Sequence, residues 1–153
     1  MSLLVSNILR LWIFLVPPLC GDARLCYCVD AGVPALLDAA DGVFIGQVLT
    51  VRDTVILGRP FHAPSRDSMT VAVATLQVRR GWKDPGSRLV AAIDLYAHTG
   101  CAADFAVGQE TLVWVKRQGN GFVLLGCNTR NVRLALARDA LRELGPVRFS
   151  HSE

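Results

Sequence analysis

The sequence predicts a small all-β domain with flanking helices, built on a five-stranded barrel that two disulfides pin together. Five segments rich in β-branched and aromatic residues are separated by Gly- and Pro-containing turns, which is typical of strands. Helical spacing appears before the first of these segments and after the last. Two cysteines, Cys26 and Cys28, lie one residue apart, and two others, Cys101 and Cys127, lie far downstream.

Residues 1–23 have the features of a secretory signal peptide. Arg10 precedes the apolar run 11–16, and Gly21-Asp22-Ala23 provides a small-x-small cleavage site. Arg10 and Pro17 interrupt the run, which is therefore shorter than the roughly 20 residues of a membrane-spanning helix. An uncleaved anchor is the alternative. We expect residues 24–153 to form one exported domain, secreted or in the periplasm or cell envelope, with no stable membrane span.

Cys20 raises the question of a lipid anchor. A lipobox has a small residue directly before its cysteine, whereas Pro17-Pro18-Leu19 precedes Cys20. We therefore expect an incidental apolar cysteine in a discarded leader, without a lipid.

The first half of residues 24–153 predicts one helix and three strands. Val33, Leu36, Leu37 and Ala40 share one helical face, and Pro34 is tolerated in a first turn. A strand over 43–51 follows, then a long exposed loop over 53–68 that is rich in Gly, Pro and Ser. The Val- and Thr-rich segment 69–79, a turn over 81–86 and the segment 88–97 complete this half.

The second half predicts a hairpin and a helix. Segments 111–116 and 121–125 flank Gln118-Gly119-Asn120, a hairpin signal. Apolar residues at 134, 137, 141 and 144 share a helical face, and Gly145-Pro146 would end that helix. Five strands in one short chain favour an OB-fold barrel, because closure removes the exposed edges of an open sheet. An immunoglobulin-like sandwich with one or two missed strands is the alternative.

The spacing of the cysteines predicts two long-range disulfides. Cys26 and Cys28 are too close for an unstrained bridge with each other, and an exported chain tends to oxidise its thiols. Each is therefore expected to reach a distant partner. Four cysteines allow three pairings, and the sequence alone does not choose among them.

The order of these segments resembles a known family. Cys-x-Cys, a short helix, "ADGVFIGQVLTV", "LQVRRGWKD", "GCAADFAVGQETLVWV" and "GNGFVLLGCNTR" together resemble the netrin-like domain. Within it, they look most like the inhibitory domain of the tissue inhibitors of metalloproteinases and their small, single-domain bacterial relatives. The resemblance covers residues 26–130 and implies a five-stranded OB barrel with the disulfides Cys26–Cys101 and Cys28–Cys127.

The same resemblance implies a mechanism of inhibition. In the family, the α-amino group and carbonyl of the first cysteine chelate the catalytic zinc of a target protease. Cys26 would take this role, Tyr27 would enter the specificity pocket, and Thr99, Gly100 and Cys101 would form the adjacent ridge. This chain has Tyr27 where the animal inhibitors have a small hydroxyl residue, and cleavage after Ala23 would leave Arg24-Leu25 ahead of Cys26.

Other function classes find less support in the residues. Cys26, Cys28 and His98 could form a zinc site, but export favours disulfides and no Cys-x2-Cys spacing occurs. His62 lies near Ser65 and Asp67, a set better interpreted as loop polars than as an enzyme site. We therefore expect no enzymatic activity, no intrinsic metal and no cofactor.

Nucleic-acid binding is not expected either. The net charge of +3 is spread along the chain. The aromatic residues that could stack on bases are instead expected in the core or at the barrel rim; they are Phe44, Trp82, Trp114 and Phe122. The basic cluster Arg79-Arg80-Gly81-Trp82-Lys83 is expected to be a solvated turn. The sequence thus predicts a domain that binds a protein, with a zinc metalloprotease as the candidate target. The alternative is a non-inhibitory interaction module of the cell envelope or extracellular space.

Overall fold

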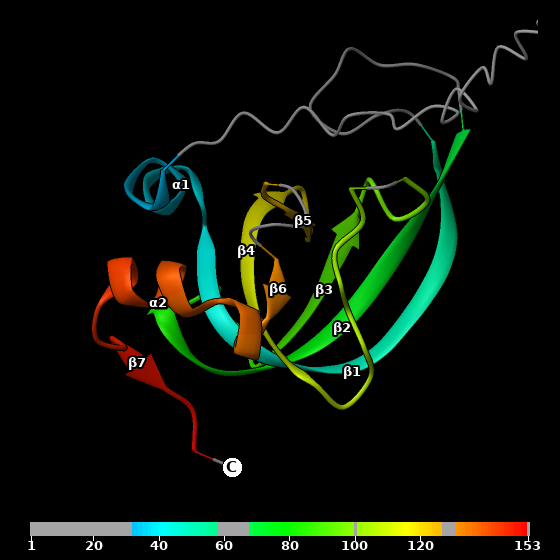
Figure 1. Ribbon diagram of the computed structural model, residues 1–153. Helices are drawn as coiled ribbons and strands as arrows, with labels where there is room; N and C mark the ends of the chain where they lie inside the picture. The colour runs from blue at the N-terminus through cyan, green and yellow to red at the C-terminus, as the bar shows by residue number, and fades with distance from the viewer. Residues whose placement is uncertain (1–31, 58–67, 100, 127–130, 153) are drawn as a thin grey trace, which may run out of the picture.

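The computed structural model describes residues 32–57, 68–99, 101–126 and 131–152. This part of the chain is mostly β, with a sheet of seven strands, two short α-helices and one 3-10 turn (Figure 1). The elements in chain order are α1 (Val33–Ala39), β1 (Gly42–Leu57), β2 (Ser68–Lys83), β3 (Leu89–Asp94), β4 (Glu110–Gln118), β5 (Gly121–Leu124), β6 (Val132–Arg133), η1 (Leu134–Leu136), α2 (Arg138–Leu144) and β7 (Phe149–Ser150).

Five of the strands form a ring. The order is β1-β2-β3-β5-β4, and a further pairing of β4 with the first part of β1 closes it. All pairs in the ring are antiparallel except β3 and β5, which run parallel. The short strands β6 and β7 add to β4 and β2 respectively. Closure pairs backbone groups that an open sheet would leave exposed.

Apolar side chains from all five ring strands form the interior. Successive residues of a strand point to opposite faces of the sheet, so Phe44 and Val113 face inward while their neighbours face outward. The interior cluster consists of Phe44, Val48, Ala74, Leu76, Val78, Val90, Ala92, Val113, Val115 and Phe122.

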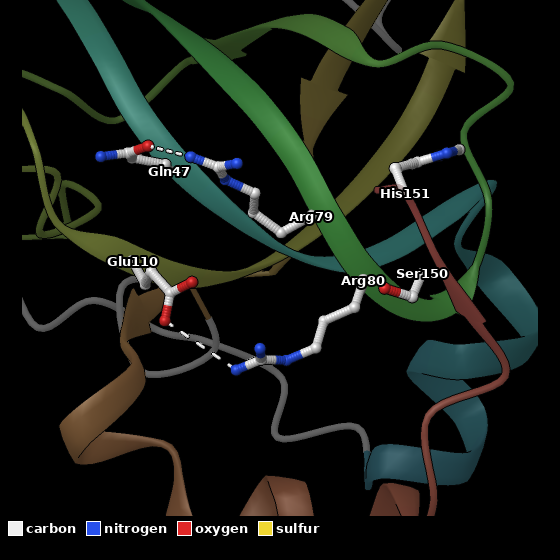
Figure 2. A pocket seen from close by; sticks show the side chains of 6 residues that line it. All are labelled: Gln47, Arg79, Arg80, Glu110, Ser150 and His151. Carbon is white, nitrogen blue, oxygen red and sulfur yellow. Dashed lines mark hydrogen bonds and ion pairs between the residues drawn. The ribbon is translucent and has the colours of Figure 1, made fainter. Parts of the chain in front are cut away.

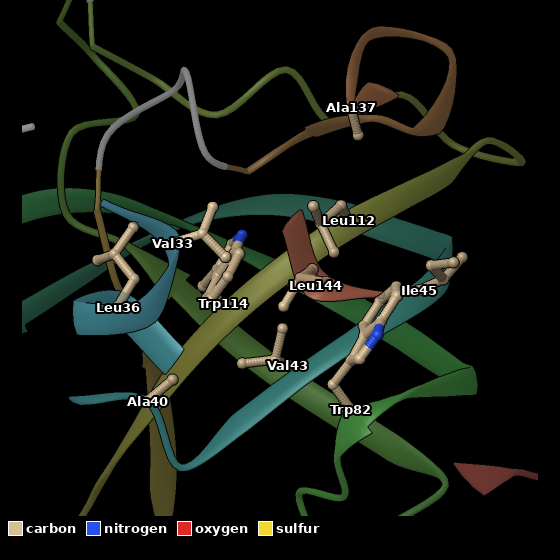
Figure 3. Packing of buried hydrophobic residues seen from close by; sticks show 10 residues of the cluster. All are labelled: Val33, Leu36, Ala40, Val43, Ile45, Trp82, Leu112, Trp114, Ala137 and Leu144. Carbon is tan, nitrogen blue, oxygen red and sulfur yellow. The ribbon is translucent and has the colours of Figure 1, made fainter. Parts of the chain in front are cut away.

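A second apolar cluster lies on the outer face, beneath the helices (Figure 3). It joins β1, β2 and β4 to both helices through Val33, Leu36, Ala40, Val43, Ile45, Trp82, Leu112, Trp114, Ala137 and Leu144. The indole Nε1 of Trp82 donates a hydrogen bond to the Gly145 carbonyl at 3.0 Å, which holds the end of α2 against β2. The four aromatic residues expected in the core or at the rim are all buried.

Strands β1 and β2 are longer than the sequence indicated. Residues 53–57 were expected in a loop, but they continue β1 and pair with Ser68–Ala72 of β2. Thr54, Val55 and Ile56 are β-branched and therefore compatible with extended backbone, and pairing with β2 satisfies the hydrogen-bonding groups of this segment. The rest of the predicted loop lies outside the described residues.

The turn predicted over 81–86 begins later than expected, because β2 extends to Lys83. Gly81, Trp82 and Lys83 belong to β2, where they lie against the beginning of β1. Gly81 permits this pairing, because a Cβ atom there would lie 2.4 Å from the Val43 carbonyl oxygen. The glycine marks a close approach of two backbones, not a turn.

The helices and the hairpin follow the sequence prediction with small changes. The β4–β5 turn contains Gly119 at φ 57°, a backbone conformation that favours glycine. The C-terminal helical segment is divided, because η1 precedes α2 and regular helix begins only at Arg138. Gly145, at φ 69°, ends α2 as expected.

Candidate functional site

The predicted inhibitory edge is only partly within the described residues. Thr99 and Cys101 are described, and both lie in the loop between β3 and β4. Cys26, Tyr27, Cys28, Gly100 and Cys127 lie outside the described residues. The structure therefore shows how the loop side of the edge is held.

A buried aspartate at the end of β3 organises this loop. Asp94 is 4% exposed, and its Oδ1 accepts a hydrogen bond from the Tyr96 backbone N–H at 2.8 Å. Its Oδ2 accepts from the Ala103 N–H, also at 2.8 Å. One carboxylate thus ties together two points of the chain on either side of Thr99 and Cys101. Hydrogen bonds to a charged acceptor are stronger than neutral ones, so this anchor is well suited to hold a projecting loop.

Thr99 makes the turn at the tip. Its backbone N–H and its Oγ1 hydroxyl both donate to the Tyr96 carbonyl at 2.8 Å. The same Oγ1 accepts from the Cys101 N–H at 3.1 Å, and the Thr99 carbonyl accepts from the Ala102 N–H at 3.2 Å. The threonine side chain is exposed while its polar atoms brace the backbone around it.

Cys101 takes part in a disulfide bond. It is the one cysteine among the described residues, so its partner lies outside them. The predicted pairing with Cys26 stays a prediction. The bond adds a covalent restraint to a loop that Asp94 and Thr99 already restrain by hydrogen bonds.

The same loop is also attached to neighbouring strands. Arg133 of β6 makes two contacts with the Asp104 carboxylate, Nε to Oδ2 at 2.6 Å and Nη2 to Oδ1 at 2.9 Å. A two-point arginine–carboxylate pair fixes orientation as well as distance. Farther along, the Gly108 N–H donates to the Val48 carbonyl at 2.7 Å, which returns the chain to β1.

His98 does not join a metal cluster in the described part of the chain. Its Nε2 lies 3.5 Å from the Asp53 Oδ1 on β1, and both side chains are exposed. No group of three or more His, Cys, Asp or Glu side chains that could hold a metal ion occurs among the described residues. From the sequence, three loop residues were also a possible enzyme site. These residues, His62, Ser65 and Asp67, lie outside the described part of the chain.

Asn131 was not identified from the sequence, although it supports the other end of the predicted cysteine framework. It is buried, its Oδ1 accepts from the Trp114 N–H at 2.9 Å, and its Nδ2 donates to the Leu125 carbonyl at 3.0 Å. Asn131 is thereby joined to β4 and to Leu125, directly after β5. An asparagine in a loop sequence gives no signal of such burial.

The basic cluster at 79–83 also differs from expectation. Trp82 is buried, and the Lys83 ammonium donates to the Ala40 carbonyl at 2.8 Å, near the C-terminal end of α1. Lys116 donates to the Ala39 carbonyl at 3.0 Å, so two lysines satisfy carbonyls at this helix end. Arg79 and Arg80 line a hollow on the outer face of the ring (Figure 2).

Comparisons with protein-family models, curated proteins and solved structures found no match for this chain. Among the described residues, no helix is both long enough and apolar enough to cross a membrane.

Proposed function

We propose that this chain is an exported, disulfide-stabilised domain that binds a protein partner and inhibits a zinc metalloprotease through the edge Cys26-Tyr27-Cys28. This mechanism requires Cys26 to be the first residue of the mature chain, whereas cleavage after Ala23 would leave Arg24-Leu25 ahead of it. Its α-amino group and carbonyl chelate the zinc of the target and displace the zinc-bound water. Tyr27 occupies the specificity pocket beside it.

The fold assignment within this proposal is an OB-type barrel. The ring of five strands and the helices over one outer face support it. The disulfides Cys26–Cys101 and Cys28–Cys127 are part of the same proposal, and the disulfide-bonded state of Cys101 supports the first of them.

The observation that carries the proposal is the restrained β3–β4 loop. An inhibitor of this kind needs a rigid ridge, because ordering flexible segments on binding reduces affinity. Asp94 spans the loop with two hydrogen bonds, Thr99 braces its tip, and Cys101 is covalently tied. Three separate restraints on one part of a loop are expected where the loop has to keep its shape against a partner.

The test is N-terminal sequencing of the exported protein together with an inhibition assay against a panel of zinc metalloproteases. A mature chain that begins at Cys26 and inhibits at least one member of the panel would support the chelation mechanism. A variant with one alanine inserted before Cys26 is expected to lose that inhibition, because the amine then belongs to a peptide bond.

The matched control carries the same extra alanine at the C-terminus, after Glu153, and is expected to inhibit as the parent does. A mature chain that begins at Arg24, or inhibition unchanged by the inserted alanine, would refute the chelation mechanism. No inhibition across the panel, together with a stable envelope partner in pull-downs, would instead establish the non-inhibitory interaction module.

A further inference from the structure

A β-bulge places two consecutive arginines on one face of the sheet. Ile45 of β1 pairs with Arg80 of β2, but the next residue, Gly46, pairs with Val78. Arg79 is therefore the extra residue of the bulge. In a regular strand, adjacent side chains point to opposite faces, whereas a bulge sets two residues opposite one and changes the alternation.

The burial of the neighbouring residues agrees with this change of alternation. Val78 belongs to the interior cluster, while Arg80 pairs with Ile45, a member of the cluster on the outer face. Residues two apart on a regular strand would share a face. The bulge between Val78 and Arg80 therefore turns Arg80 to the outer side, where Arg79 lines the same hollow.

The two arginines line an open hollow of about 370 Å³ (Figure 2). Its lining comes from four strands and the C-terminal tail: Gln47, Arg79, Arg80, Glu110, Ser150 and His151. The backbone of Ser150 is held beside Arg80 by the pairing of β7 with β2. The His151 Nε2 lies 3.6 Å from the Asp84 Oδ2. This imidazole therefore faces Asp84, and it lines one side of the hollow.

The polar groups in the hollow differ in how firmly they are held. Arg79 donates to the Gln47 Oε1 at 2.7 Å, a short hydrogen bond that orients both side chains. Arg80 and Glu110 lie 3.9 Å apart, too far for a hydrogen bond, and their side chains are 44% and 43% exposed. Such a loose, solvated pair contributes little, so an anion can replace Glu110 as the partner of Arg80.

We propose that this hollow binds the phosphate group of a small hydroxylated molecule. Guanidinium groups from adjacent residues offer donors in more than one plane, which suits a tetrahedral oxyanion better than a planar carboxylate. The Ser150 hydroxyl adds a donor at the rim. Glu110 and the Gln47 amide supply an acceptor and donors for the hydroxyl groups of the same ligand. The site is independent of the inhibitory edge and uses none of its residues.

The test is a titration of the purified protein with inorganic phosphate, glucose 6-phosphate, glucose and acetate, followed by calorimetry and amide NMR shifts. We expect saturable shifts at Gln47, Arg80 and Ser150 with both phosphates, tighter binding of glucose 6-phosphate, and weak or no binding of glucose and acetate. Arg80→Ala is expected to weaken phosphate binding about tenfold or more. Glu110→Gln is expected to strengthen binding of inorganic phosphate, because it removes the competing carboxylate.

Arg142→Ala is the matched control, since Arg142 is an exposed arginine of α2 that faces Asp139 at 3.4 Å. It removes the same charge elsewhere and is expected to leave the affinity unchanged. The absence of saturable shifts, or equal weakening by Arg80→Ala and Arg142→Ala, would overturn the site. Acetate that binds as tightly as phosphate would overturn the phosphate assignment, and glucose 6-phosphate no tighter than phosphate would overturn the hydroxyl contacts.

Discussion

Asp94 illustrates how much of the candidate edge depends on one side chain. A buried carboxylate needs partners that offset its loss of hydration, and here two backbone N–H groups of the loop provide them. The same two hydrogen bonds fix the conformation of the loop and satisfy the buried carboxylate. Asp94 lies inside the predicted strand 88–97 and is the last residue of the observed β3, and the sequence suggested no role for it.

We predict that Asp94→Asn lowers the free energy of unfolding by about 1–3 kcal/mol. The amide keeps one acceptor oxygen but presents an NH₂ group to an N–H donor, so one of the two hydrogen bonds is lost. Urea unfolding and hydrogen exchange measure this, and the Ala103 or Tyr96 amide should exchange faster. Asp139→Asn, at an exposed position of α2, is the control, and equal effects of the two variants would contradict the role of Asp94.

Gly81 allows the backbones of β1 and β2 to approach closely, because it has no side chain. A Cβ atom at this position would lie 2.4 Å from the Val43 carbonyl oxygen and 2.6 Å from the Phe44 Cα, both backbone atoms. Neither can move without separating β1 from β2. Only glycine permits this register.

We therefore predict that Gly81→Ala destabilises the protein by about 2–3 kcal/mol or more, which thermal or urea unfolding would measure. The control is Gly121→Ala in β5, where the nearest atom to an added Cβ, the Gln118 carbonyl oxygen, is 3.9 Å away. That variant should be neutral or slightly more stable. Similar losses at both positions would show that backbone approach is not what Gly81 provides.

At the scale of elements, helix α2 is too short to be stable on its own. An isolated helix of this length forms only marginally in water, so tertiary packing has to stabilise it. Leu144 and Ala137 bury themselves in the outer cluster, and the Trp82 indole binds the carbonyl of Gly145. The helix is thus attached to the sheet at its apolar face and at its end.

We predict that Leu144→Ala lowers the free energy of unfolding by about 2–4 kcal/mol, because Leu144 is 7% exposed and its removal leaves a cavity. Leu136→Ala is the matched control. Leu136 is 70% exposed in η1, and its replacement should change stability by no more than about 0.5 kcal/mol. Urea unfolding of both variants tests the prediction, which fails if the two losses are equal.

At the scale of the whole molecule, the disulfide bond of Cys101 restrains a loop that connects two strands of the ring. The β3–β4 loop joins strands that are not neighbours in the ring, since β5 lies between them. If Cys101 is bonded to Cys26, as the resemblance implies, the bond limits the conformations of the unfolded chain across much of its length.

We predict that Cys101→Ser lowers the free energy of unfolding by about 2–4 kcal/mol under oxidising conditions. Under reducing conditions the difference from the parent should shrink, because the parent then loses the same bond. The control is Thr99→Ser, which retains the hydroxyl that binds the Tyr96 carbonyl. Peptide mapping would identify the partner of Cys101, and a free thiol at this position in the oxidised protein would contradict the prediction.

The sequence predicted some features of this fold well, because they depend on local periodicity. The five ring strands, the hairpin at Gly119 and the helical spacing that ends at Gly145 all follow from residues close in the chain. The burial of Trp114 and Phe122 followed from their apolar surroundings. Local sequence patterns alone therefore predicted a mostly β domain with a helical segment near each end.

Long-range contacts decided the rest. The extension of β1 to Leu57 and of β2 to Lys83 depends on pairing between the two strands, whereas the Gly, Pro and Ser residues near these ends predicted a loop and a turn. The buried Asn131 and the anchor Asp94 are polar residues whose importance comes only from the backbone groups that the fold brings to them.

The amino-acid sequence by itself predicted the class of the fold and the number of ring strands, since hydrophobic period and turn residues are local features of the chain. The residues of the candidate edge were implied by the resemblance to the netrin-like domain. Only the tertiary structure decided the strand order of the ring, the restraint of the β3–β4 loop and the position of Arg79 and Arg80 on one face. The physical reason is that backbone pairing selects the register. A single bulge in that register reverses which side chains face solvent, and local sequence does not encode where it falls.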